Sequence, residues 1–129
     1  MQIHQSAEDY LETILMLNQR MGRVRSIDVV NELGYTKASV SIAMKKLREN
    51  GYIAVDGEGN LTLLEPGREI AERIYSRHQL LTHFFVQLGV DEQTAAEDAC
   101  KAEHILSEQT LEKIRESALR NDAAHPQAK

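Results

Sequence analysis

A succession of short elements in the first half of the sequence leaves few folds open. Residues 26–34 and 37–50 each have the apolar spacing of a helix, and a glycine ends both stretches. Two apolar runs, residues 53–55 and 61–63, lie on either side of residues 56–60, whose two glycines permit a hairpin. The pattern predicts helix, turn, helix and a two-stranded wing, which is a winged helix-turn-helix.

The rest of the chain reads as helix. A first helix is expected over residues 7–18, with Ser6 as its N-cap and an apolar face, and a long helix over 66–88. Two more are expected over 91–105 and, with Ser107 as N-cap, over 107–120. The apolar positions of the first helix are Tyr10, Leu11, Ile14, Leu15 and Leu17. The predicted fold is mainly α, with a winged helix-turn-helix domain over residues 1–64, an all-helical domain over 65–120 and a disordered tail over 121–129.

Composition favours association and an intracellular setting. The chain has 129 residues, 42% hydrophobic residues, no Trp and two Phe, so its core is modest and would gain from burying apolar surface in a dimer. The single Cys excludes an intramolecular disulfide, and no signal peptide or membrane-length apolar run is present. We therefore expect a cytoplasmic protein with a reduced thiol.

Charge is divided unevenly along the chain. The net charge is −5, but residues 20–48 hold seven basic and two acidic residues, which gives +5 there and −10 elsewhere. The basic residues are Arg20, Arg23, Arg25, Lys37, Lys45, Lys46 and Arg48. A local positive face is what phosphate contact requires, although a solvated charged surface explains the charges alone equally well.

The start of the second helix of the pair carries small and polar side chains suited to close approach. Recognition helices present their first turns to base edges, whereas longer basic side chains further along reach phosphates. Val40, Ala43 and Leu47 would face inward. The candidate DNA-contacting residues are Arg25, Thr36, Lys37, Ala38, Ser39, Ser41, Lys45 and Lys46. Ordinary Ser/Thr capping of a helix start is the alternative for these residues taken alone.

Several side chains have the chemistry and spacing of metal ligands. Cys100, Glu103 and His104 stand at i, i+3 and i+4 in a predicted helix, so they would share one face. Asp9 and Glu12 repeat the i, i+3 spacing, and a further helix holds His78. Together they offer sulfur, nitrogen and oxygen donors for a divalent transition metal. Each has a common alternative. A lone Cys is usually a small buried hydrophobe, and acidic residues near a helix N-terminus are favoured without metal. His78 would otherwise be a hydrogen-bonded helix histidine, and Glu103 and His104 would be surface residues.

With these motifs in place, the sequence resembles the diphtheria toxin repressor and manganese transport regulator family of metal-dependent repressors. The similarity covers residues 7–12, the winged helix, and residues 63–68, 77–81 and 100–107. It implies a DNA-binding domain over residues 1–64 and a helical metal-binding and dimerisation domain over 65–120. The C-terminal helices would form a homodimer, with metal bound where the two parts meet. The ligand positions of the manganese branch fall on Asp9, Glu12, His78, Glu103 and His104.

Two departures from the family pattern concern the metal. At the position of Cys100 the manganese branch has Glu, whereas the iron branch has Cys as this chain does. The site therefore looks like a hybrid of the two branches. The ancillary site of the iron branch is expected to be absent, because Thr82 and Ala96 stand at its positions. The chain also ends where the iron branch continues into an SH3-like domain, so it resembles the short, two-domain form.

The function expected is repression of metal-uptake genes, through double-stranded DNA with a two-fold operator, in response to Mn(II) or Fe(II). Co(II), Ni(II) or Zn(II) could serve as surrogates, and no enzymatic activity is expected. One alternative is a winged-helix regulator switched by oxidation of Cys100 or by a small ligand. Another is a small metal-dependent hydrolase with Glu103 or Glu12 as general base, for which the sequence has no substrate-pocket signature.

Overall fold

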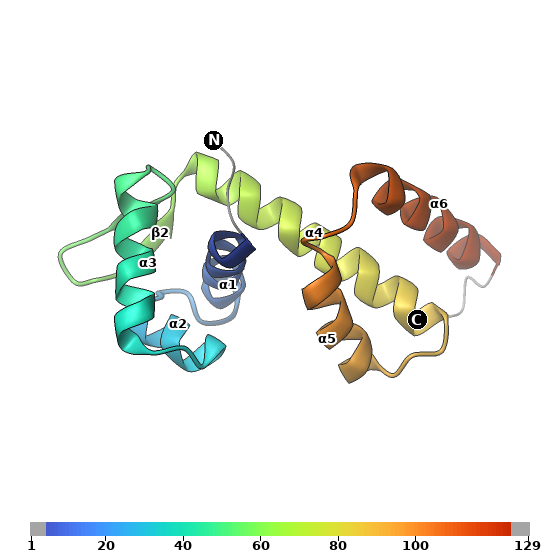
Figure 1. The fold of residues 1–129 in the computed structure, drawn as a ribbon, viewed down its shortest axis with the longest axis horizontal. Helices are drawn as coiled ribbons and strands as arrows, with labels where there is room; N and C mark the ends of the chain where they lie inside the picture. The colour runs from blue at the N-terminus through green and yellow to red at the C-terminus, as the bar shows by residue number, and fades with distance from the viewer. Residues whose placement is uncertain (1–4, 125–129) are drawn as a thin grey trace. The chain divides into compact units, whose positions relative to one another are not determined.

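A computed structural model describes residues 5–124, and of Ala124 only the backbone, as six helices and two short strands (Figure 1). The helices are α1 (Gln5–Met21), α2 (Ser26–Leu33), α3 (Lys37–Glu49), α4 (Glu65–Gln87), α5 (Glu92–Ala102) and α6 (Glu108–Ala124), and the strands are β1 (Ile53–Val55) and β2 (Leu61–Leu63). The chain divides into two compact units, with the boundary inside α4 between Arg73 and Ile74. No helix among residues 5–124 has the length and apolar character needed to cross a membrane.

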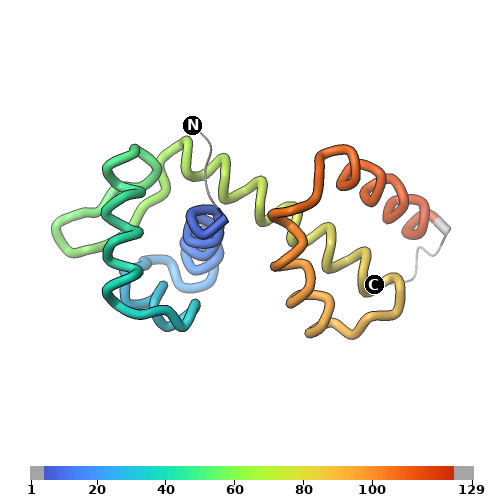
Figure 2. Tube along the Cα trace, in the orientation of Figure 1, coloured from blue at the N-terminus to red at the C-terminus, as the bar shows by residue number. Residues whose placement is uncertain are grey.

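The first unit is a winged helix-turn-helix, as the sequence predicts. The strands β1 and β2 form an antiparallel hairpin in which Ile53 pairs with Leu63, and Figure 2 traces this hairpin beside α3. Contacts join α1 to both α2 and α3. All five apolar residues expected on the buried face of α1 are buried, as are Val40 and Leu47 of α3. The hydrophobic periodicity therefore places the exposed face of α3 correctly, because the opposite face is fixed in the core.

Local chemistry explains where the elements of this unit end. Gly34 follows α2 with a φ of 72°, a left-handed conformation that glycine adopts without a Cβ penalty. In the hairpin turn, the Asp56 carboxylate accepts hydrogen bonds from the backbone N–H groups of Glu58 and Asn60, both at 2.9 Å, and from the Asn60 side chain at 3.0 Å. The Asn60 side-chain hydrogen bond is the main reason that the pKa of Asp56 is lowered.

The second unit consists of the end of α4 with α5 and α6. Its core contains Leu81 of α4, Ala99 of α5 and Leu111 of α6, packed together and buried. Asp91 caps α5 by accepting a hydrogen bond from the Thr94 N–H at 3.1 Å. The expected cap of α6 is confirmed, because the Thr110 N–H donates to the Ser107 hydroxyl oxygen at 3.1 Å.

Four expected helix boundaries are wrong, and one of them is the end of the first helix, which continues to Met21 and not only to Asn18. The first helix already includes Gln5, so Ser6 lies inside it and is not its N-cap. The helix expected to reach Ile105 ends at Ala102, and the next residues form a turn. Two N–H groups, those of Ile105 and Leu106, donate to the Ala102 carbonyl, which tightens the chain before Ser107 starts the next helix.

The last helix is longer than expected and removes part of the predicted tail. It continues through residues 121–124, because side chains of its last turns are held by α4. Gln87 Nε2 donates to Asp122 Oδ1 at 2.8 Å, and His83 Nε2 lies 3.0 Å from the same oxygen. Residues 125–129, for which disorder was also predicted, lie outside the described residues.

Candidate nucleic-acid interface and metal centre

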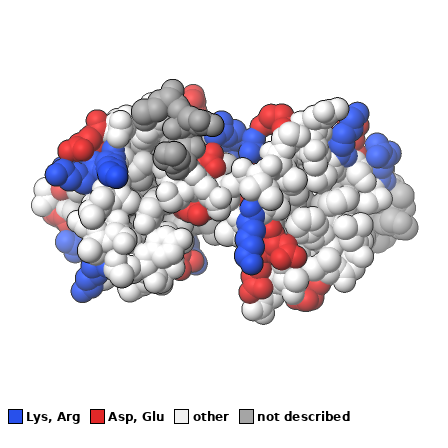
Figure 3. All heavy atoms as spheres, viewed as in Figure 1, with Lys and Arg blue, Asp and Glu red and all other residues white. Residues whose placement is uncertain are grey.

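All eight candidate DNA-contacting residues are exposed in the first unit. Seven of them lie at or within α3, and the eighth, Arg25, precedes α2 and pairs through its backbone with Asn60 of the wing. Figure 3 shows Lys and Arg side chains on the side of the first unit where Figure 1 places α3. Exposed cations on a helix anchored by a buried opposite face suit contact with phosphates.

Thr36 has a structural role at the start of α3. Its hydroxyl oxygen accepts a hydrogen bond from the Ser39 N–H at 3.1 Å, and its hydroxyl donates to the Ser39 oxygen at 2.9 Å. This N-cap is the capping role weighed as the alternative from the sequence. The two hydroxyl groups lock the first turn of α3, so Thr36 orients the helix whether or not it also contacts DNA.

A buried carboxylate dominates the candidate metal centre in the second unit. Glu103 is fully buried, and neither of its carboxylate oxygens has a hydrogen-bond partner among residues 5–124. Two imidazoles flank it: His78 Nδ1 lies 3.3 Å from Oε2, and His104 Nε2 lies 3.4 Å from Oε1. Both distances are in ion-pair range, but the orientations do not make hydrogen bonds. Buried charges are normally paired or bound to a metal, and two nitrogens beside a carboxylate fit a divalent cation.

Arg77 holds the turn that carries these groups. Its guanidinium donates to the Glu103 carbonyl oxygen at 3.2 Å and forms an ion pair with Glu108 at the start of α6. The Arg77 side chain is only 15% exposed, but that of Glu108 is 79% exposed, so the contact with the Glu103 carbonyl is shielded from water and the ion pair is not. The sequence gives no sign of this role of Arg77, because a contact with a backbone carbonyl does not depend on residue spacing.

The remaining metal-ligand candidates are placed as follows. Asp9 and Glu12 lie on α1 in the first unit, at the expected spacing of three residues, and Glu12 is buried. Cys100 is exposed on α5 and belongs to no group of three ligand-type side chains within reach of one ion in the described part of the chain. Although α5 ends at Ala102, Glu103 is its C-cap with a right-handed helical backbone, and its N–H donates to the Ala99 carbonyl at 3.0 Å, so the spacing of three residues from Cys100 is helical. The two side chains differ in burial, because Cys100 is exposed and Glu103 is fully buried.

The fold and the exposed basic helix define a DNA-binding protein of the winged helix-turn-helix class. Residues 2–61 match the iron dependent repressor N-terminal DNA binding domain, and residues 64–126 match the iron dependent repressor metal binding and dimerisation domain. An uncharacterized HTH-type transcriptional regulator of Methanocaldococcus jannaschii is 37% identical over 86% of this chain and 90% of its own length. The HTH-type transcriptional regulator MntR of Bacillus subtilis is 34% identical over 84% of this chain and 77% of its own length.

Solved structures agree with these relationships. A manganese-dependent transcriptional repressor in complex with manganese matches with a TM-score of 0.79 and 27% identity over 87% of this chain. The structure of IdeR from T. acidophilum has the same fold, with a TM-score of 0.79 and 21% identity over 91% of this chain. This chain spans 52% and 55% of those two proteins, about half their length.

The chain belongs to the iron-dependent repressor family, and it is a metal-dependent DNA-binding transcriptional repressor. The family resemblance noted from the motifs is confirmed. Since both matching family models belong to a repressor that binds metal and DNA, the hydrolase and the oxidation-switched or ligand-switched regulator are not favoured.

Proposed function

We propose that this repressor senses Mn(II) or Fe(II) and, with metal bound, represses genes of metal uptake in the cytoplasm. One observation carries the proposal: the Glu103 carboxylate is buried beside His78 and His104 without a hydrogen bond to either oxygen. A buried carboxylate that the protein does not solvate needs a cation, and a divalent metal meets that need.

The proposed ligand set contains nitrogen, oxygen and sulfur donors. Glu103, His78 and His104 would supply one oxygen and two nitrogens, and Asp9 and Glu12 of α1 would add the hard oxygens that Mn(II) and Fe(II) both accept. Cys100 is proposed as a further ligand, in keeping with the hybrid pattern. A softer or later metal such as Co(II), Ni(II) or Zn(II) would serve as a surrogate.

The proposed coupling of metal to DNA is electrostatic and entropic. When bound, the ion supplies positive charge that offsets the carboxylates of Asp9, Glu12 and Glu103. Because α1 packs against α2 and α3, restraining α1 also restrains the helix that would read DNA. Less freedom is then lost when DNA binds, which raises affinity without any new contact to DNA.

The proposed DNA target follows from dimer symmetry. A homodimer presents two copies of α3. Each copy would bind one half-site of a two-fold operator whose half-sites lie about one helical turn apart. The first turn of α3, with Lys37, Ala38 and Ser39, would meet base edges, and Lys45 and Lys46 would contact phosphates. All five side chains are exposed as this docking requires.

DNA selected from a randomised pool by the manganese-loaded protein would provide the operator for the test. Its affinity would then be measured with and without Mn(II) or Fe(II) for the wild type, Glu103→Gln and Glu97→Gln. Glu97→Gln is the matched control, because Glu97 is exposed on α5. We expect Glu103→Gln to bind at the metal-free level in the presence of metal, and the control to behave as wild type.

Full metal stimulation in Glu103→Gln would contradict the proposal. So would binding that ignores added metal but responds to peroxide, which is the behaviour of an oxidation switch at Cys100.

A further inference from the structure

An apolar side chain stands in the middle of the exposed face of α3. Ala38, Ser41, Ile42 and Lys45 follow the spacing i, i+3, i+4 and i+7, so they share one side of the helix, away from the buried Val40. Ile42 is 58% exposed and is the only large apolar residue among these four. Single exposed apolar residues are common, so its significance depends on its surroundings.

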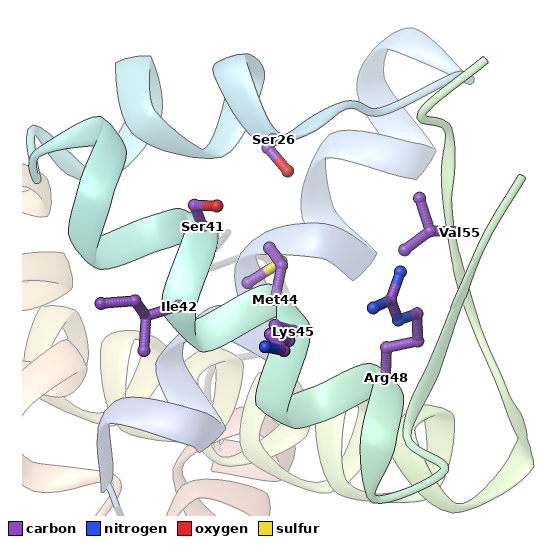
Figure 4. Close-up of a pocket in the computed structure, with 7 residues that line it drawn as sticks. All are labelled: Ser26, Ser41, Ile42, Met44, Lys45, Arg48 and Val55. Carbon is purple, nitrogen blue, oxygen red and sulfur yellow. The ribbon is translucent and has the colours of Figure 1, made fainter. Parts of the chain in front are cut away.

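Ile42 borders two hollows of the first unit. One, of about 320 Å³, lies between α3, the start of α2 and β1, and Figure 4 shows Lys45 and Arg48 along it, with Ile42 on the flank of α3 away from Val55. The other, of about 300 Å³, is lined by Ile42 together with Tyr10 of α1 and by Lys46 of α3. No other element covers the Ile42 side chain in the described residues, and exposed cations stand on both sides of it.

The charges around Ile42 decide what its partner is. Lys45, Lys46 and Arg48 are all exposed within six residues of Ile42, and no described ion pair engages them. A protein partner that covered Ile42 with an apolar side chain would also desolvate these cations without supplying negative charge. DNA supplies phosphates for the cations and an apolar group for the isoleucine. The major groove exposes one apolar group, the C5-methyl of thymine.

We infer that Ile42 is a specificity-determining residue that recognises a thymine methyl group in each half-site. This inference rests on the proposed docking of α3 in the major groove. The side chain has no hydrogen-bonding atom, so it cannot read a base edge by donor and acceptor pattern. Its short neighbours, Ala38 and Ser41, let it approach the groove floor. Lys45 and Arg48 give affinity for any sequence, and Ile42 gives preference for one base.

The test removes the methyl group from either side of the contact. Each thymine of the selected operator would be replaced in turn by deoxyuridine, which lacks only the C5-methyl group. Affinities would be measured at fixed Mn(II) for the wild type, Ile42→Ala and Ile27→Ala. The last is the matched control, because Ile27 is an exposed isoleucine on α2. A Lys45→Ala protein would report separately on phosphate contact.

We expect one thymine per half-site at which deoxyuridine weakens wild-type binding about fourfold, the ratio that burial of one methyl-sized group gives. In Ile42→Ala that position should lose its sensitivity, while the Ile27→Ala series should match the wild type. Ile42 is exposed, so the variant should keep the circular dichroism and unfolding midpoint of the wild type.

An Ile42→Ala protein with the same deoxyuridine profile as the wild type would overturn the inference. If Lys45→Ala nevertheless weakened binding to operator and random DNA alike, with a salt slope lower by about 1, the docking of α3 would stand and only the role of Ile42 would fail. If neither variant changed binding, the proposed docking itself would be wrong.

Discussion

Among single residues, Gly67 is packed so closely by its neighbours that no side chain fits there. A Cβ atom at this position in the first turn of α4 would lie 2.2 Å from the Tyr52 carbonyl oxygen and 3.3 Å from Leu11 Cδ2. We predict that Gly67→Ala lowers the free energy of unfolding by about 1–3 kcal/mol, because backbone must move to admit the methyl group. Urea denaturation of the metal-free protein would measure the loss. The gain in helix propensity from alanine works in the opposite direction and is smaller.

Gly57→Ala is the matched control, because a Cβ there meets no atom within 4 Å and the backbone is not left-handed. Equal unfolding midpoints for the two variants would show that the close approach at Gly67 does not constrain the fold.

Cys100 is the residue whose role bears most on metal preference. A thiolate favours metals later in the Irving–Williams order, so we predict that Cys100→Glu keeps activation by Mn(II) but weakens activation by Fe(II) or Co(II). Thiolate ligation should also give the cobalt-loaded wild type a sulfur-to-metal charge-transfer band in the near ultraviolet. The exposed position of Cys100 makes this measurement decisive. Absence of the band, or its survival in Cys100→Glu, would remove Cys100 from the ligand set.

The role of a residue could be predicted from the sequence where the role depends on local periodicity. It could not be predicted where the role depends on contact with backbone atoms far away in the sequence. The exposure of Lys45 and the burial of Leu47 follow from a helical pattern with one buried face. The close approach at Gly67 and the bond from Arg77 to the Glu103 carbonyl join residues far apart in sequence, and neither depends on a repeating pattern. Spacing alone makes Glu103 a candidate ligand, but spacing does not predict that its carboxylate is buried.

Among the elements, the strands and the helices of the winged helix were predictable because short turn residues delimit them. Gly34 ends α2, and the turn at residues 56–60 separates the two strands at the expected positions. The boundaries of α1 and of the helices in the second unit were less predictable. The end of α5 depends on the hydrogen bonds that the N–H groups of the turn before Ser107 donate to the Ala102 carbonyl. The end of α6 depends on a hydrogen bond from Gln87 of α4. Tertiary contacts therefore overrode local propensity there.

The α5–α6 turn gives a prediction at the scale of elements. Arg77 ties this turn to α4, so Arg77→Met should leave the helices intact but let Glu103 and His104 move. We expect metal affinity, measured calorimetrically with Mn(II), to fall about 10-fold to 100-fold, as is usual when a group supporting the ligands is lost. Circular dichroism of the metal-free protein should change little.

Arg73→Met is the control for this prediction, because Arg73 is half exposed and pairs with Glu8 in the first unit at 3.4 Å. An exposed pair of this kind contributes little. Wild-type manganese affinity in Arg77→Met would show that the turn holds its shape without the arginine.

For the whole molecule, charge is concentrated in one segment of the chain. The net charge of −5 combines a value of +5 over residues 20–48 with −10 elsewhere. The positive segment includes the exposed face of α3, and the carboxylates proposed as ligands belong to the negative remainder. A single figure for net charge would have argued against DNA binding, whereas its distribution favours both DNA and a cation as ligands of the same chain.

The two ligands must then influence each other equally. If Mn(II) tightens operator binding by some factor, the operator must tighten Mn(II) binding by the same factor, and couplings of this kind are typically about 5-fold to 150-fold. Both factors can be measured by titrating metal with and without saturating operator, and operator with and without metal. We predict that Glu12→Gln reduces this common factor, because Glu12 is the buried carboxylate of α1 and α1 packs against α3. Lys45→Ala should weaken DNA binding in both metal states and leave the factor unchanged, because a phosphate contact does not depend on metal. A Glu12→Gln protein with an undiminished factor would show that metal reaches the reading helix by a route other than the α1 carboxylate.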